Sequence, residues 1–185
     1  AFLSGPGVFD GDLEYEPDRD WIGVRLTPGS TRDFVFTVQG AATGAGTLVN
    51  PVVRLYDTAG TLIDQADSGG VNGEPFLKYT LDGALPDPGV GNPTLFAEVG
   101  SVGDDSVGTW RLTVIEDDFG AEIASAGSLS VDQPTEGRID FFGDDDAFVF
   151  NRPIPSATYF VKVEGQRDGG GTVPVPEVEF LTMNG

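Results

Sequence analysis

The sequence predicts an all-β fold, an antiparallel β-sandwich of jelly-roll-like type, and three observations support this prediction. Short segments in which apolar and polar residues alternate, rich in β-branched and aromatic side chains, recur along the chain. The 27 Gly and 13 Pro residues punctuate these segments at turn-like intervals. No segment keeps the apolar spacing of a helix over three turns. Many short strands joined by regular turns are typical of sandwiches and jelly rolls.

The first three expected strands lie between residues 20 and 56. Residues 20–26 and 33–38 each open with Asp and continue with aromatic and β-branched side chains. Residues 52–56 form a third apolar run, which Asp57-Thr58-Ala59-Gly60 closes with residues typical of a β-turn. This order of strand, turn and strand is the pattern of an antiparallel sheet.

Three further strands are expected before residue 117, and three after it. Residues 76–81, 94–99 and 109–114 alternate apolar side chains with Lys, Thr, Glu or Arg, which is the period of a strand with one buried face. The later strands are shorter apolar runs that contain Phe, at residues 148–150, 159–161 and 178–181.

The chain is strongly acidic, with 30 Asp and Glu against 10 Lys and Arg and a formal net charge of −20. Such a charge repels phosphate backbones and anionic lipid headgroups, so nucleic acid is not an expected partner. No stretch approaches the roughly 18 apolar residues of a membrane helix, so membrane insertion is not expected either. The partners that this charge favours are hard cations, which prefer oxygen ligands.

The absence of His and Cys removes most catalytic chemistry. Ser-His-Asp and Cys-His machinery, His- or Cys-ligated zinc and disulfides all require these residues. Lys78 and Lys162 leave little scope for Schiff-base chemistry. A carboxylate hydrolase stays open in principle, but no sequence feature places two carboxylates across a cleft. We therefore expect a protein that is not an enzyme.

An internal repeat organises the chain. Residues 33–60 align with residues 158–185 without a gap at an offset of 125, and eight of these 28 positions are identical. Upstream the offset is 126, where Gly11, Asp18 and Asp20 recur as Gly137, Asp144 and Asp146. The second copy stops at the equivalent of Gly60, so the chain is expected to be a slice of a longer tandem array.

An ordered set of motifs resembles the bacterial pre-peptidase C-terminal domain family. The set begins with Gly11, Asp18-Arg19-Asp20-Trp21 and Pro28-Gly29. It continues through the Gly-rich loop 40–47, the strand 51–57, Gly60 and the final strand 108–114. Trp110 stands where the family has Tyr, and the second copy has Ala147 where the first has an aromatic residue. The resemblance implies two β-sandwich modules, residues 1–117 and a C-terminally incomplete module at 118–185.

The resemblance also implies a role and a location. Modules of this family are attached to secreted proteases and other large extracellular bacterial proteins, so we expect an extracellular or cell-surface location. The expected role is structural, in spacing, assembly or filament formation with neighbouring domains or copies of the same protein. The alternative is an accessory module that binds a polysaccharide or a fibrous protein, which requires exposed aromatic side chains.

The Asp pairs are the main candidate metal ligands. Residues i and i+2 of an extended strand share a face, so Asp18 and Asp20, and likewise Asp144 and Asp146, each bring two carboxylates together. The family resemblance places calcium between the inter-module linker and the Asp-x-Asp motif. That relation draws further ligands from the linker acids Glu116-Asp117-Asp118, of which Glu116 and Asp118 are the expected ones. Solvated turn acids are the alternative interpretation.

Other candidate residues have simpler explanations. Asp64, Asp67 and Asn72 flank a Gly-rich turn, and turn formation alone accounts for them, as it does for Asp104-Asp105. The loop Gly165–Gly171 lacks the Lys and the helix of a phosphate loop. The two Trp residues lie in apolar strand runs and are expected to be in the core; they are Trp21 and Trp110.

An incomplete second module would leave apolar side chains bare. The opposing sheet of the first module is expected to come partly from residues 61–117, which have no counterpart in the second copy. We therefore expect the missing half to come from further chain or from a neighbouring copy. The side chains that report on this are Phe148, Phe150, Phe160 and Phe180.

Overall fold

A computed structural model describes residues 1–26, 31–82, 94–141, 143–150, 154 and 156–181. The chain divides into two compact units. The first unit consists of Ala1–Ser128 and Thr135–Val149, and the second consists of Leu129–Pro134 and Phe150–Gly185. The division into tandem modules at residue 117 stays a prediction. Within the described ranges, no helix combines the length and the apolar character needed to cross a membrane.

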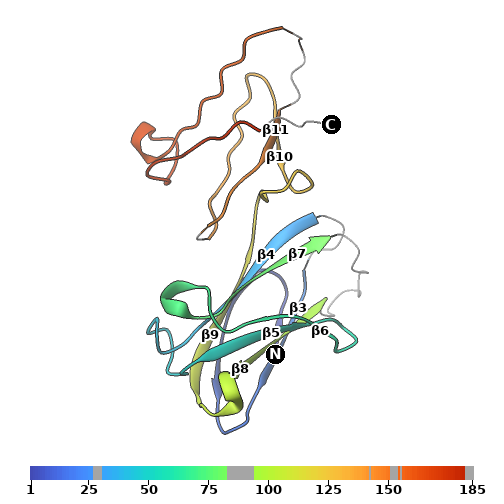
Figure 1. Ribbon diagram of the computed structural model, residues 1–185, viewed down its shortest axis with the longest axis vertical. Coiled ribbons are helices and arrows are strands. Elements are labelled where there is room, and N and C mark those ends of the chain that lie inside the picture. The colour runs from blue at the N-terminus through green and yellow to red at the C-terminus, as the bar shows by residue number, and fades with distance from the viewer. Residues whose placement is uncertain (27–30, 83–93, 142, 151–153, 155, 182–185) are drawn as a thin grey trace. The chain divides into compact units, whose positions relative to one another are not determined.

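Strands β1 to β9 of the first unit form a sandwich of two β-sheets, which confirms the predicted all-β class (Figure 1). One sheet has the strand order β1-β3-β8-β5-β6 and the other has the order β2-β9-β4-β7. Their bounds are β1 Phe2–Leu3, β3 Asp20–Val24, β8 Leu95–Ser101, β5 Pro51–Tyr56 and β6 Leu62–Ala66, then β2 Gly7–Leu13, β9 Gly108–Glu116, β4 Thr31–Gln39 and β7 Phe76–Asp82. Strand β1 runs parallel to β3, and the other strand pairs described in these two sheets are antiparallel.

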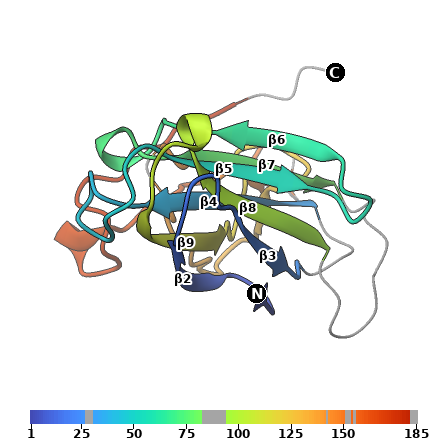
Figure 2. The ribbon, with the colours of Figure 1, turned by 90° about the horizontal axis from the view of Figure 1, so that it is seen from below.

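Consecutive strands of the first unit alternate between the two sheets, except that β6 follows β5 in the same sheet (Figure 2). This alternation is typical of a jelly-roll-like sandwich. The inward-facing residues of both sheets form one buried cluster, in which Phe34, Phe36 and Trp110 are the largest side chains. At the edge of the four-stranded sheet, β2 pairs with β9 in a register that runs from Gly7 opposite Val114 to Leu13 opposite Gly108.

All six strands expected before residue 117 are present, at the expected places within a few residues. Strand β2 was not expected, because it contains two Gly and two Asp, which are rare in strands. The structure explains Gly11, because a Cβ there would lie 2.2 Å from the ring of Trp110. Strand β6 is an exposed edge strand without the apolar alternation that marks a buried face.

Two expected strands of the later segment are absent from the described structure. Strands β10 (Gly127–Leu129) and β11 (Phe148–Phe150) pair in a small two-stranded sheet, but residues 159–161 and 178–181 are not strands. A strand needs a neighbour to satisfy its backbone groups, and neither segment has one within the described residues. The Phe side chains there are exposed, by 94% for Phe160 and 76% for Phe180. Phe148 and Phe150 are half-buried, so the expectation of a missing half stays a prediction.

The two Trp residues have different environments, which corrects one expectation. Trp110 is 1% exposed and belongs to the core, as expected. Trp21 is 44% exposed, because Ile22 and Val24 occupy the inward face of β3 and leave Trp21 on the outer face. The expected turn at Pro28-Gly29 and the terminal Gly185 lie outside the described residues.

Candidate metal centre

Five aspartates of the first unit converge beyond the end of β9. Two of them, Asp117 and Asp118, follow β9 directly, and the other three, Asp140, Asp144 and Asp146, lie in the loop before β11. They form two overlapping groups that share Asp117: one with Asp118 and Asp146, the other with Asp140 and Asp144. Within each group, one carboxylate oxygen of each residue lies within 4.8 Å of the others.

Backbone hydrogen bonds hold the linker side of this cluster. The Asp117 N–H donates to the Asp33 carbonyl at 2.9 Å, which continues the pairing of β9 with β4 by one residue. The Phe119 N–H then donates to Oδ1 of Asp117 at 3.2 Å and fixes that carboxylate. The ring of Phe119 packs on Phe148 at a centroid distance of 4.9 Å. The linker therefore folds against β11, within the first unit.

A tight turn holds the loop side. The Asp140 N–H donates to Oδ2 of Asp144 at 2.7 Å, and the Asp144 N–H donates to the Phe141 carbonyl at 3.2 Å. Three residues after Asp144, the Ala147 N–H donates to the Gly120 carbonyl at 3.2 Å. This turn directs the carboxylates of the loop toward the linker.

Three carboxylate oxygens of the cluster are buried and have no hydrogen-bond partner among the residues that the structure describes. They are Oδ2 of Asp117, Oδ2 of Asp140 and Oδ1 of Asp146. A buried polar atom left without a partner is costly, and a buried charge is more costly still. The donor set consists entirely of carboxylate oxygens, which suits a hard cation such as calcium. The residues present therefore fit a calcium ion on the chemistry of their donor atoms.

The electrostatics of the cluster also favour a cation. Burial raises the pKa of Asp146 to about 7, and the negative charges of Asp118 and Asp144 add to this effect. Burial, followed by the charge of Asp144, raises the pKa of Asp117 to about 6. Burial raises the pKa of Asp144 as well. These carboxylates cannot all be ionised at once without a large cost, unless a cation binds among them.

The basic side chains beside the cluster offset only part of this charge. Arg138 pairs with Oδ1 of Asp140 at 2.6 Å, and its own side chain is largely exposed. Lys78 pairs with Asp33 at 2.8 Å. Two cations at the margin face five aspartates, so the centre of the cluster keeps a negative potential.

The structure brings together three of the six residues predicted as metal ligands: Asp118, Asp144 and Asp146. Glu116 does not join them, because its carboxylate pairs with Arg32. Sequence reasoning did not select Asp117 and Asp140. The signal for Asp117 was its place in the acidic run at residues 116–118. The signal for Asp140 was its position four residues before Asp144. This spacing becomes a contact only when the turn folds and the Asp140 N–H donates to Asp144.

The predicted ligands Asp18 and Asp20 lie elsewhere in the first unit. Asp18 accepts the Glu14 N–H on Oδ2 at 3.0 Å, and Asp20 accepts the Trp110 indole N–H on Oδ2 at 3.2 Å. In the part of the chain that the structure describes, neither belongs to a converging group of three or more acids.

The turn that contains Asp18 has the same hydrogen bonds as the turn that contains Asp144. The Asp18 N–H donates to the Tyr15 carbonyl at 2.7 Å, and 126 residues later the Asp144 N–H donates to the Phe141 carbonyl. In both turns, the Asp side chain accepts the N–H of the residue four positions earlier.

The Gly-rich loops also agree locally, at the offset of 125. Gly44 and Gly169 have φ angles of 76° and 75°, in the left-handed region that favours glycine. Their N–H groups donate to the carbonyls of Ala41 and Gln166 at 3.2 and 3.3 Å. The sequence repeat therefore coincides with repeated local geometry.

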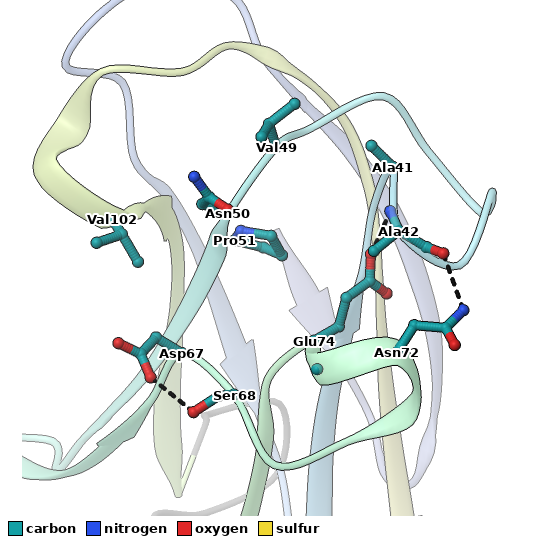
Figure 3. Close-up of a pocket in the computed structure, with 11 residues that line it drawn as sticks. Ala41, Ala42, Val49, Asn50, Pro51, Asp67, Ser68, Asn72, Glu74 and Val102 are labelled. Atoms are coloured by element: carbon teal, nitrogen blue, oxygen red, sulfur yellow. Dashed lines mark hydrogen bonds between the residues drawn. The ribbon is translucent and has the colours of Figure 1, made fainter.

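The other acidic turn residues contact nearby loops. Asp67 accepts the Ser68 hydroxyl at 2.9 Å, and the Asn72 side chain donates to the Ala42 carbonyl at 2.9 Å. Figure 3 marks both bonds with dashed lines. Glu74 is 4% exposed, and its Oε1 accepts three backbone N–H groups of the facing loop, those of Gly40, Ala42 and Thr43. The bonds of Asn72 and Glu74 link their loop to the facing loop at residues 40–43, and residues of both loops line one pocket.

Comparison with known proteins gives matches among solved structures, whereas no protein-family model and no curated protein matches the chain. Among solved structures, the chain is similar to the crystal structure of the pre-peptidase C-terminal domain of a collagenase from Bacillus anthracis. The match covers 62% of this chain and 92% of that one, with 11% identity and a TM-score of 0.40. At this identity the likeness concerns the fold alone.

Proposed function

We propose that this chain is a non-catalytic, calcium-stabilised β-sandwich protein with an architectural role in a larger extracellular bacterial protein. The observation that carries the proposal is the convergence of five aspartates, three of them with buried oxygens that lack a partner. The role is to space, assemble or attach neighbouring domains or copies of the same protein.

Calcium would act as a cross-link within the first unit. Asp117 and Asp118 lie on the segment that leaves the sandwich, and Asp140, Asp144 and Asp146 lie on the loop that precedes β11. A cation bound by both segments would hold the linker in one conformation and remove the repulsion among the carboxylates. A fixed linker is what a spacing or assembly role requires.

The tandem arrangement is part of the proposal. The turns of Asp18 and Asp144 share their hydrogen bonds at the repeat offset, which supports a common origin for the two sequence copies. In that arrangement the metal site marks the start of each successive copy.

The extracellular location rests on the family resemblance and on metal supply. Extracellular calcium modules bind with Kd values on the order of 10⁻⁴–10⁻³ M, which suits a site completed by carboxylates and water. The non-catalytic role rests on the composition, which lacks His and Cys.

Thermal unfolding with and without calcium tests the proposal. Calcium at about 100 times its Kd stabilises a protein that binds it only when folded by ~2.7 kcal/mol, which corresponds to about 5–10 °C in Tm at this size. We expect Tm to rise by this amount between EDTA and saturating calcium. Asp146→Asn should abolish most of the rise.

The matched control is Asp145→Asn, which removes the same charge from an exposed neighbour outside the cluster. It should keep the calcium response. A Tm that is equal in EDTA and in calcium overturns the proposal, as does an equal response of the two variants.

A further inference from the structure

The outer face of the five-stranded sheet carries a cluster of aromatic side chains around Trp21. Strand β8 lies between β3 and β5, with Trp21 and Arg54 both opposite Glu98 and with Tyr56 opposite Phe96. The inward positions of these three strands belong to the core, so these side chains share the opposite face.

Trp21 is held in place on this face while much of its surface remains free. Its ring lies 4.7 Å from that of Tyr56 and 6.3 Å from that of Phe96, at interplanar angles of 39° and 66°. Trp21 thus leans across β8 toward β5. It remains 44% exposed. A supported and exposed indole is a preformed stacking surface, because binding costs it little side-chain entropy.

Polar groups with balanced charge border this surface. Glu98 is 1% exposed and accepts hydrogen bonds from Arg54 at 2.6 Å and from Arg19 at 3.4 Å. The Arg19 guanidinium also pairs with both carboxylate oxygens of Asp104, at 3.1 and 2.5 Å. Two Arg and two acidic side chains offset one another, so the border is locally neutral in a chain of net charge −20.

We propose that this surface, defined by Trp21, Tyr56 and Phe96 with Arg19 and Asp104 at its border, binds a single chain of an uncharged polysaccharide. The apolar face of a sugar ring would stack on the free face of Trp21. Its hydroxyl groups would exchange hydrogen bonds with the partly exposed Arg19 and Asp104.

Charge and shape select this occupant over others. The net charge of the chain repels polyanions. The acidic groups at the border are already paired with Arg19 and Arg54, so the surface offers no free charge to a cationic glycan and favours an uncharged one. The aromatic rings are mutually tilted and present no common plane, so a flat crystalline surface would contact only part of them. A single twisted chain can follow such a surface.

Affinity electrophoresis of the whole chain tests the proposal. The gels contain soluble β-glucan, xylan or galactomannan, with alginate as the anionic control. We expect at least one uncharged polysaccharide to retard the protein and alginate not to. Trp21→Ala should weaken binding by at least about tenfold, the loss expected of a central aromatic contact. Trp21→Tyr should keep most of the binding.

The control variant is Tyr15→Ala, which removes an aromatic residue that is 64% exposed and outside the cluster. It should bind like the unmodified chain. In Trp21→Ala and Trp21→Tyr, the remaining Trp110 is buried, so its fluorescence reports whether the core is intact.

Three outcomes overturn the proposal. The first is no retardation by any of the uncharged polysaccharides. The second is equal binding by folded Trp21→Ala and by the unmodified chain. The third is cosedimentation with collagen fibrils, lost in Trp21→Ala, without binding to any polysaccharide, since that result would assign the surface to a fibrous protein.

Discussion

The indole N–H of Trp110 donates to a carboxylate oxygen of Asp20 at 3.2 Å, and this bond joins the buried core to the start of β3. The sequence placed Asp20 in a metal-binding pair. In the folded chain it instead satisfies the one polar atom of the largest core side chain, which has 1% of its surface exposed.

The first prediction follows from this bond. Asp20→Ala leaves the Trp110 N–H without its acceptor and should lower the free energy of unfolding by about 1–3 kcal/mol. Asp20→Asn keeps an acceptor oxygen and should cost less. Urea unfolding measures both. The calcium response of Asp20→Ala should be unchanged, and a lost response would place Asp20 in the metal site after all.

The second prediction concerns pH in the presence of a chelator. The pKa values of Asp146 and Asp117 are raised to about 7 and about 6 in the folded chain, from 3.8. The folded state therefore holds protons that the unfolded state has released, and stability falls as pH rises from about 4 to about 7. In EDTA, we expect higher stability at pH 5 than at pH 7.5.

Saturating calcium should reverse that trend, because protons compete with the metal for the same carboxylates. Some carboxylates have a lowered pKa, such as Asp104 beside Arg19. Their contribution to stability is lost only at a pH below about 4, outside the range of about pH 4 to 7. Unfolding midpoints across pH, with and without calcium, measure the two slopes. Parallel slopes would contradict the assignment.

The third prediction concerns the close packing of β2 on Trp110. A Cβ at Gly11 would lie 2.2 Å from the indole ring, whereas a Cβ at Gly7 on the same strand would meet only Leu3, at 3.8 Å. Gly11→Ala should therefore destabilise the chain by about 1–3 kcal/mol, as overpacked core sites do. Gly7→Ala is the matched control and should be nearly neutral. Chemical denaturation separates the two.

The fourth prediction concerns monovalent salt. At a net charge of −20, self-repulsion opposes the compact state, and screening reduces it. The unfolding midpoint should rise between about 0.02 and 0.5 M NaCl, where the Debye length shortens severalfold. The measurement is made in saturating calcium to keep the metal site filled. A flat or falling series would mean that screened ion pairs outweigh the repulsion.

The sequence predicted the strands whose inward face is an unbroken row of apolar side chains and missed strands without such a row. Period-two alternation marked β4 and β9, which lie inside a sheet, because burial forces that pattern. In β2, Gly7 and Gly11 interrupt the inward row that holds Phe9 and Leu13, and β6 is an exposed edge strand. Trp21 was assigned to the wrong face because apolar residues occupy both faces of its strand. Ile22 and Val24 alternate with Trp21 along the strand, and their face is the one that packs in the core.

The candidate site was predictable only in part. The spacing of Asp144 and Asp146 indicates a shared face from local geometry alone, and the linker acids came from the family resemblance. Asp140 enters through a turn whose hydrogen bond closes only on folding. Asp117 belongs to the site because its N–H pairs with the Asp33 carbonyl, one residue beyond β9, and its side chain is buried there. Contacts of this kind depend on tertiary structure, which no spacing rule contains.

The register of β2 against β9 determines how the first unit responds to mechanical load. Gly7, where β2 begins, lies opposite Val114, close to where β9 ends. A pull that separates these two points loads the hydrogen-bonded pairs one after another, toward Leu13 and Gly108. Under such a pull, this edge of the sandwich therefore separates by unzipping from the Gly7 corner rather than by shear along the whole strand pair.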